Sequence, residues 1–306
     1  MERLADMGED ALIERLLRQL KDPCSIGDQI IVGPGDDCAV VDLGQRGKYQ
    51  LLKTDSMVEG VHYLPETPPA KVGWKAVARV ISDFAAMGGM PGQLLVTIAM
   101  PSTKSVVYME RLYQGMQRCA SAHGAVICGG ETSSVPDGSA AVISVAGTGW
   151  VERARCTTRS GGKAGDRILV SGKLGRSIRG KHLSFSPRLE EARWLTENFR
   201  IRAMMDLSDG LGRDLARLAM ASGCGYRIEE QSLPRNRACD IAQALWDGED
   251  YELLFTVSAR TAAKLCDAWK DRFPALSLTV VGELIGGQSA AAPESSGWQH
   301  FKSKPL

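Results

Sequence analysis

The sequence predicts an α/β (α+β) protein of two domains, and three observations support this fold class. The chain has 306 residues, more than a single hydrophobic core usually serves. Short β-rich runs alternate with segments of helical periodicity along its whole length. A polar, glycine-rich segment from Arg153 to Asp166 divides this series in two. We therefore place one domain at residues 1–152 and a second at residues 153–306.

The first domain is predicted to begin with a helix and to continue as a mixed series. Before residue 20, charged residues alternate with Leu and Ile at helical spacing. We expect strands at 29–32, 39–42, 49–53, 94–100, 125–128 and 140–151, and a helix at 105–123. A further helix is expected at 70–87, because its apolar residues recur every three or four positions: Val72, Ala76, Val77, Val80, Ile81 and Phe84.

The second domain repeats this alternation after the glycine-rich segment. Strands are expected at 168–171, 203–206, 226–229, 252–257 and 278–281, with helices at 187–197, 211–222 and 259–273. Several acidic residues follow these strands directly. Open α/β sheets place their ligands beyond strand ends, so these positions are candidates for a binding site.

Composition excludes several classes of function. The net charge is +1, so no long-range basic field attracts nucleic acid or an anionic membrane. No apolar run reaches membrane-spanning length, and the N-terminal segment lacks the apolar core of a signal peptide. The eight cysteines form no CxxC pair and lie among apolar residues. Reduced, mostly buried thiols in a cytoplasmic protein are the expectation.

Short acidic clusters next to glycine or serine are the main functional signal. Each cluster alone is equally well explained as a turn or a helix cap. Taken together, so many carboxylates would repel one another unless cations held them, and hard oxygen ligands suit Mg²⁺ bound with phosphates. The clusters are Gly35-Asp36-Asp37, Thr54-Asp55-Ser56, Ser82-Asp83, Gly129-Gly130-Glu131-Thr132, Asp206-Leu207-Ser208-Asp209-Gly210 and Gly248-Glu249-Asp250.

The common motifs for phosphate chemistry and hydrolysis are absent from the sequence. There is no GxxxxGK[ST] loop, no GxGxxG fingerprint and no HRD/DFG kinase pair. No histidine pair has HExxH spacing, and no serine lies in a GxSxG elbow. Metal held by carboxylates is therefore the remaining means of binding phosphate.

The ordered motifs of the chain resemble the thiamine-monophosphate kinase family. They span nearly the whole sequence, and the resemblance implies two domains of the aminoimidazole-ribonucleotide synthetase type. It also implies a homodimer in which the N-terminal sheets form a shared barrel, and a C-terminal α/β sandwich. The motifs are Gly35–Val40, Thr54–His62, Ser82–Gly88, Thr158–Gly161, Asp206–Leu211, Gly248–Leu253 and Gly297–Phe301.

The resemblance further implies ATP- and Mg²⁺-dependent phosphorylation of thiamine monophosphate to thiamine diphosphate, with several Mg²⁺ ions. The residues implied to be catalytic are Asp55, Asp209 and Arg159. The implied metal ligands are Asp37, Thr54, Asp55, Asp83, Glu131, Asp206 and Asp209. Nucleotide contacts fall on Gly130, Glu131, Arg159 and Ser208, and substrate contacts on His62, Glu249 and Trp298.

Trp298 has a chemical property that suits its implied role. The sequence also departs from the family pattern at several positions. Trp298 offers a π face to a cationic thiazolium, worth about 2 kcal/mol when desolvated, although a tryptophan near a chain end equally often only packs. Glu131 stands where the family usually has Asp, and Lys53 where some members have Ser. The segment between Gly172 and Arg188 is also shorter than expected.

Two other classes of function stay open on the sequence. A sister synthetase of the same superfamily would share the fold and the metals while making an acyl phosphate or a selenophosphate. A non-catalytic nucleotide-binding protein would bind ATP without turnover, and the longer carboxylate of Glu131 is the feature that favours it.

Overall fold

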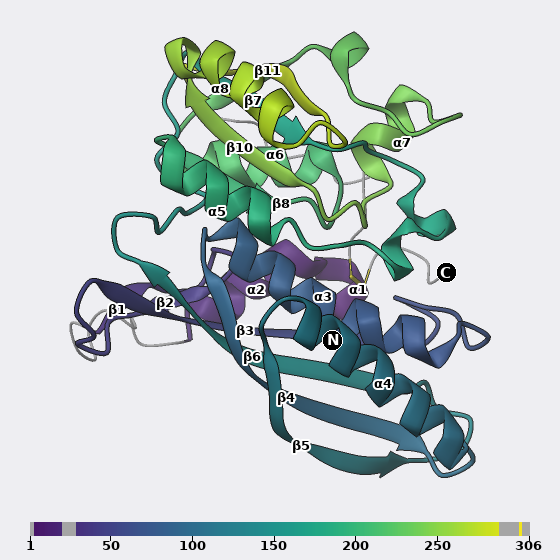
Figure 1. Ribbon diagram of the computed structural model, residues 1–306. Coiled ribbons are helices and arrows are strands. Elements are labelled where there is room, and N and C mark those ends of the chain that lie inside the picture. Colours follow the sequence, from purple (N-terminus) through teal and green to yellow (C-terminus); the bar gives the residue numbers. More distant parts are fainter. Residues whose placement is uncertain (1–2, 20–28, 288–299, 302–306) are drawn as a thin grey trace.

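Two β-sheets stacked around a central helix make up the protein (Figure 1). The computed structural model describes residues 3–19, 29–287 and 300–301. The N-terminal sheet has six strands in the order β1-β2-β3-β6-β4-β5, and the C-terminal sheet has five in the order β8-β10-β7-β11-β9. The two α/β halves predicted from the sequence are therefore present.

The N-terminal sheet is antiparallel except for its last pair, β4 and β5, which run parallel. A parallel pair needs a crossover, and helix α4 (Val106–Ala122) provides it. The strands are β1 (Ile30–Val32), β2 (Ala39–Val41), β3 (Lys48–Val58), β4 (Met90–Pro101), β5 (Val126–Val135) and β6 (Val142–Glu152).

One face of this sheet is covered by helices and the other is open. Buried and half-buried residues alternate along β6, so one side of the strand faces the core. Helix α3 (Pro69–Ala86) packs on that side together with α4. The opposite face carries apolar side chains that remain accessible, with Leu52 42%, Leu95 52% and Val126 60% exposed.

The C-terminal sheet is fully antiparallel and has helices on both faces. Along β10, Leu253 and Phe255 point into one apolar cluster, whereas Leu254 points into another. The strands are β7 (Asp166–Ser171), β8 (Ala203–Asp206), β9 (Gly225–Ile228), β10 (Leu253–Ser258) and β11 (Leu278–Ile285).

The C-terminal helices divide between the two apolar clusters. Helices α5 (Leu189–Asn198) and α8 (Ala259–Arg272) share a cluster with α3, and α6 (Leu211–Ala221) and α7 (Ile241–Trp246) lie in the other. Short 3₁₀ helices are η2 (Ser177–Arg179), η3 (Lys181–Leu183) and η4 (Glu230–Ser232). The sandwich predicted for the C-terminal domain is confirmed in this arrangement.

The core runs without interruption from one sheet to the other. A single cluster joins Phe84 of α3 to Leu94 of β4 and to Met204 and Phe255 of the C-terminal sheet. Strand β6 ends at Glu152 and β7 begins at Asp166. Because the two halves share a core, the division at residue 152 stays a prediction about sequence organisation.

The order of the predicted elements is confirmed, while some local assignments were wrong. The predicted first helix is two helices, α1 (Leu4–Met7) and α2 (Glu9–Leu17), because Gly8 between them has a positive φ of 79°. Strands β3 and β5 extend past the acidic clusters at Asp55 and Glu131. Asp83 lies inside α3. These three carboxylates therefore belong to regular elements and not to tight turns.

The described cysteines are all free, and four of them are buried: Cys38, Cys119, Cys224 and Cys239. Cys24 lies outside the described residues. Among the helices that the structure describes, none combines the length and hydropathy needed to span a membrane.

Close contact between α3 and α4 depends on two glycines. A Cβ on Gly73 would lie 2.0 Å from the Leu112 carbonyl oxygen, and one on Gly115 would lie 2.0 Å from that of Ala70. We expect Gly73→Ala and Gly115→Ala each to lower the free energy of unfolding by about 1–3 kcal/mol, since overpacking forces the helices apart. Urea unfolding measures this. Gly286→Ala, whose Cβ would meet no atom within 4 Å, is the control and should leave stability unchanged.

Candidate active site

Three buried aspartates from three different elements meet between the two sheets. Asp37 lies just before β2, Asp83 is on the last turn of α3 and Asp206 ends β8. One carboxylate oxygen from each comes within 4.8 Å of the others. We call Asp37, Asp83 and Asp206 the acidic cluster. It joins residues more than 160 positions apart at the seam of the two halves.

The electrostatics of the acidic cluster favour a bound cation. Burial, and then the charge of Asp37, raise the pKa of Asp206 to about 7. Burial likewise raises the pKa of Asp83 well above its ordinary value. The Oδ2 atom of Asp37 is buried without a hydrogen-bond partner. Oxygen ligands with an unused buried lone pair suit Mg²⁺, so the residues present fit this ion.

Basic side chains of the protein flank the acidic cluster. Lys53 Nζ lies 2.8 Å from Asp83 Oδ1 and 3.7 Å from Asp55 Oδ1. Burial alone would lower the pKa of Lys53, but the carboxylates of Asp83 and Asp55 raise it above its ordinary value. Lys53 is thus a fixed positive charge. Both side chains lie on the core-facing side of β3, where the alternation of the strand places them together.

Arg159 reaches the acidic cluster from the segment that connects the sheets. Its Nη2 lies 2.5 Å from Asp37 Oδ1, and its backbone N–H donates to the two carboxylate oxygens of Asp36 at 3.1 and 3.3 Å. The Nε atom of Arg159 is buried with no hydrogen-bond partner. A guanidinium with an unused donor at this place can donate a hydrogen bond to a phosphate oxygen.

The loop after β8 is held by the first turns of α6. The backbone N–H groups of Ser208 and Asp209 both donate to Asp214 Oδ2 at 3.0 Å. Arg217 Nη1 pairs with Asp209 Oδ2 at 2.5 Å, and Arg217 Nη2 pairs with Asp10 of α2 at 3.1 Å. Asp209 is therefore neutralised by an arginine in this structure and is separate from the acidic cluster.

A pocket lies next to these carboxylates on the N-terminal side of α3. Its lining includes His62, Arg79, Ser208, Asp209, Glu249 and Tyr251. Two of the residues predicted to contact substrate, His62 and Glu249, therefore face the same pocket as Ser208 and Asp209. The third, Trp298, lies outside the described residues.

A fully buried lysine organises the far end of this pocket. Lys75 Nζ donates to the His62 carbonyl oxygen at 2.7 Å, lies 2.5 Å from Glu249 Oε2 and is 2.8 Å from His182 Nδ1. Burial lowers the pKa of Lys75 to about 8. Burial would raise the pKa of Glu249, but Lys75, His182 and Arg79 hold it below its usual range. Glu249 therefore stays ionised in the pocket.

His62 is a neutral ring with a defined tautomer. The Val58 backbone N–H donates to His62 Nδ1 at 3.0 Å, so the proton of the neutral ring is on Nε2. Burial lowers the pKa of His62 to about 3. The side chain can donate one hydrogen bond from Nε2 and carries no charge at neutral pH.

The loop that carries Glu249 has an unusual backbone. Glu249 and Tyr251 have positive φ angles of 59° and 50°, a conformation that costs non-glycine residues roughly 1–3 kcal/mol each. Two hydrogen bonds hold it: the Glu249 N–H donates to the Ser208 carbonyl at 2.7 Å and the Tyr251 N–H to that of Leu207 at 2.7 Å. The loops after β8 and before β10 are thereby locked together around the pocket.

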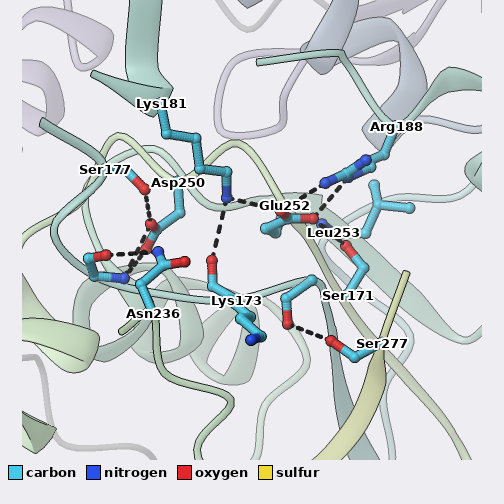
Figure 2. A network of polar contacts seen from close by, with 12 residues as sticks. Ser171, Lys173, Ser177, Lys181, Arg188, Asn236, Asp250, Glu252, Leu253 and Ser277 are labelled. Carbon is cyan, nitrogen blue, oxygen red and sulfur yellow. Dashed lines mark hydrogen bonds and ion pairs between the residues drawn. The ribbon is translucent and has the colours of Figure 1, made fainter. Parts of the chain in front are cut away.

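The shortened segment between Gly172 and Arg188 is tied down by two carboxylates (Figure 2). Asp250 accepts hydrogen bonds from Ser177 Oγ and from the Gly175 N–H, the latter at 3.0 Å. Glu252 accepts from Lys181 Nζ at 2.8 Å and twice from Arg188 at 2.7 Å. These contacts hold the segment that carries His182, whose Nδ1 lies 2.8 Å from Lys75 Nζ. Asp250, part of a predicted acidic cluster, thus serves the fold.

Three further predicted residues, Thr54, Gly130 and Glu131, lie away from the acidic cluster. The Thr54 hydroxyl lies 3.5 Å from that of Ser144, and the alternation of β3 places it on the opposite face from Lys53 and Asp55. Gly130 and Glu131 lie on edge strand β5, and β6 and β4 separate that strand from β3. Glu131 is exposed. Gly130 has a packing reason, since a Cβ there would lie 1.9 Å from the Val96 carbonyl oxygen.

Comparison with known proteins agrees with this geometry. The family models for AIR synthase related proteins match residues 35–151 (N-terminal domain) and 167–292 (C-terminal domain). The thiamine-monophosphate kinase of Rhodopirellula baltica is 34% identical over 276 residues, 84% of each chain. That of Aquifex aeolicus is 32% identical and covers 98% of this chain and 100% of its own. The chain belongs to the thiamine-monophosphate kinase family.

A solved structure of a family member has the same architecture. AaThiL in complex with AMPPCP and TMP superimposes with a TM-score of 0.83 at 31% identity, covering 98% of this chain and 99% of that one. The predicted family and fold are confirmed. As a member of a kinase family, the chain is an enzyme whose relatives transfer phosphate.

Sequence reasoning missed Lys75, Arg79 and His182. For the first two, a signal was present. Lys71, Lys75, Arg79 and Asp83 are spaced by four in a mostly apolar helix, which places four charged groups along one stripe of α3, the last three of them away from its exposed first turn. A charged stripe on a helix that is buried nearly all round marks a site. His182 had no comparable signal, because its position depends on the segment around it, which Ser177 and Lys181 bind to Asp250 and Glu252 (Figure 2).

Magnesium should stabilise the family member through the acidic cluster. A ligand that binds only the folded state raises the unfolding temperature, so added Mg²⁺ should raise it for the wild type and much less for Asp206→Asn. Differential scanning fluorimetry of EDTA-treated protein over a Mg²⁺ series measures this. Asp267→Asn, an exposed carboxylate on α8, is the control. Equal Mg²⁺ responses in Asp206→Asn and wild type would rule Asp206 out as a ligand.

The metal-free protein should also lose stability as the pH rises. The folded-state pKa of Asp206 is about 7, above the value of about 3.9 in unfolded chains, so folding favours its protonated form. That stability is complete below pH ~4 and disappears as the pH passes through ~7. We expect wild type in EDTA to lose stability relative to Asp206→Asn over this range in urea unfolding. Parallel stability curves would contradict the raised pKa.

Proposed function

We propose that this chain catalyses the ATP- and Mg²⁺-dependent phosphorylation of thiamine monophosphate, giving thiamine diphosphate and ADP by direct in-line transfer. The observation that carries the proposal is the buried acidic cluster beside a pocket lined by His62 and Glu249, in a member of this family. Relatives named thiamine-monophosphate kinase and a relative solved with AMPPCP and TMP support it.

The acidic cluster would hold magnesium. When bound, Mg²⁺ supplies positive charge that offsets the repulsion between the two phosphates and helps to align them. Asp37, Asp83 and Asp206 are the ligands that the geometry favours. Asp55 and Asp209 belong to the same proposal, and each also lies in an ion pair, Asp55 with Lys53 and Asp209 with Arg217.

Arg159 and Ser208 would contact the nucleotide. Arg159 keeps its buried Nε–H free while its Nη2 pairs with Asp37, so the guanidinium can bridge the acidic cluster and a phosphate oxygen. Ser208 follows Asp206 in the loop that Asp214 holds rigid. Both residues come from the C-terminal half or its linker, so closing the nucleotide site draws the two halves together.

The pocket would take the thiamine moiety and its phosphate. Glu249 stays ionised and offers a counter-charge to the thiazolium cation, and His62 offers a hydrogen bond from Nε2. Trp298 remains the proposed π surface. The attacking phosphate oxygen already carries negative charge, so the reaction needs no general base. Lys75, with its charge engaged by Glu249, holds the pocket in shape.

We further propose that the chain acts as a cytoplasmic homodimer. The open face of the N-terminal sheet exposes Leu52, Leu95 and Val126, and β5 is an uncovered edge strand. A second copy packed on this face would complete a barrel and cover both. Thr54, Gly130 and Glu131 lie on this side of the molecule, so any metal or nucleotide contact they make involves the dimer interface.

The proposed reaction has a direct test. Purified chain with Mg-ATP and thiamine monophosphate should form thiamine diphosphate and ADP in equal amounts, resolved by chromatography, and EDTA should abolish turnover. Asp55→Asn and Asp209→Asn should each lower kcat by about 100-fold or more while remaining folded, because an amide oxygen is a neutral, weaker ligand. Asp267→Asn should retain full activity.

The other classes of function give different results in the same experiment. ATP binding with no thiamine diphosphate formed would favour the non-catalytic nucleotide-binding protein. Turnover of ATP only when a carboxylic acid or selenide is supplied would favour a sister synthetase. Unchanged kcat in both aspartate variants would remove Asp55 and Asp209 from the site.

A further inference from the structure

Arg79 occupies a place in the pocket that the proposed reaction has not yet used. It lies on α3, one turn after Lys75 and one turn before Asp83. Its side chain is 14% exposed and lines the pocket with His62, Glu249 and Asp209. The Arg79 guanidinium is therefore mostly buried, and it lies on α3 between the acidic cluster and the pocket.

The hydrogen bonds of Arg79 leave donors unused. Nη1 donates to the Ser56 carbonyl at 2.9 Å. Nε lies 3.5 Å from Asp55 Oδ2, within ion-pair range, yet it is buried without a hydrogen-bond partner. A guanidinium has five N–H donors in a fixed planar fork. A buried donor without a partner is costly, so the free side of this fork is suited to a ligand.

The charges around the pocket show which ligand group Arg79 fits. Asp209, Asp247 and Glu249 line the pocket, and two of them are already paired with cations, Asp209 with Arg217 and Glu249 with Lys75. Lys75 is fully buried and engaged by Glu249, so these pairs offer an entering phosphate no free positive charge. Among the described lining residues, Arg79 is the one Lys or Arg. Among these residues, Arg79 therefore has the charge and the donors that suit a phosphate monoester.

We propose that Arg79 binds the phosphate group of the acceptor and is a further catalytic residue, an inference that rests on the proposed function. Two N–H groups of the fork hold two acceptor oxygens, which leaves the third oxygen to attack. The bond from this oxygen to the γ-phosphorus forms as the bond between the γ-phosphorus and the β,γ-bridging oxygen breaks. The electron pair leaves with ADP, and no proton is transferred.

This role predicts that Arg79 distinguishes phosphorylated from unphosphorylated thiamine. Wild type should bind thiamine monophosphate more tightly than thiamine. Arg79→Gln should bind the monophosphate about 10- to 100-fold more weakly, the usual range for losing hydrogen bonds to a charged group, and should bind thiamine as before. Arg79→Lys keeps the charge but loses the fork, so its affinity should be intermediate. Turnover of both variants should fall in the same order.

Isothermal titration calorimetry with Mg²⁺ and AMPPCP present compares the two ligands. Arg153→Gln removes an arginine that pairs with Asp42 at 2.6 Å and does not line the pocket; it is the matched control and should behave as wild type. Thermal unfolding checks each variant. If Arg79→Gln does not fold, the monophosphate-to-thiamine affinity ratio of Arg79→Lys decides.

The two proposals fail in distinguishable ways. An unchanged affinity ratio in a folded Arg79 variant, with wild type still making thiamine diphosphate, overturns the role of Arg79 alone and leaves it a counter-ion of Asp55. A wild type that neither binds thiamine monophosphate nor makes the diphosphate overturns the proposed function and this inference with it. The role of Arg79 in binding the acceptor phosphate is supported if the preference for thiamine monophosphate over thiamine is lost in Arg79→Gln and partly kept in Arg79→Lys.

Discussion

Charge balance in the seam between the two sheets is the constraint on which the rest of the structure depends. Asp37, Asp83 and Asp206 are buried within a few ångströms of one another, and their mutual repulsion has to be offset. The protein offsets part of it with Arg159 on Asp37 and Lys53 on Asp83. The remainder appears as the raised pKa of Asp206 and the unpaired oxygen of Asp37. A bound cation would stabilise the ionised form of Asp206 and would give the buried Asp37 oxygen a partner. This is the physical basis of the proposed Mg²⁺ site.

Helix α3 connects the charged residues between the two sheets. Its apolar residues join the cores of both sheets, and its charged stripe runs from Lys75 through Arg79 to Asp83. Because successive members are about one turn apart, the stripe links the pocket lined by His62 and Glu249 to the acidic cluster along a single rigid element. Sites held on a helix keep their spacing better than sites held on loops. The loop carrying Glu249 is then fixed against this helix by the Lys75 ion pair and against β8 by its backbone hydrogen bonds.

The sequence predicts the order of the elements and the family because periodicity and ordered motifs are local signals. The number of acidic clusters predicted a shared site, but the choice of Asp37, Asp83 and Asp206 among its metal ligands came through the resemblance, since no local rule brings positions this far apart together. Asp55 was placed at the end of a strand because polar clusters usually mark turns, but eleven consecutive pairings with β6 carry β3 past it. His182 could not be foreseen, because Asp250 and Glu252 place it by contacts distant in sequence (Figure 2). Trp298 stays a prediction.

Lys53 is a fixed cation that neutralises part of the carboxylate charge at the site. Its ammonium lies between Asp83 and Asp55, closer to Asp83, and its positive charge is secured by both. An ammonium cannot leave with the product, as a metal bound to ADP can. The edge of the acidic cluster next to β3 therefore receives part of its neutralising charge from the protein itself. Arg79 likewise neutralises Asp55, and Arg217 neutralises Asp209. Tethered cations thus take over part of the charge neutralisation that a site of bare carboxylates would leave to metal alone.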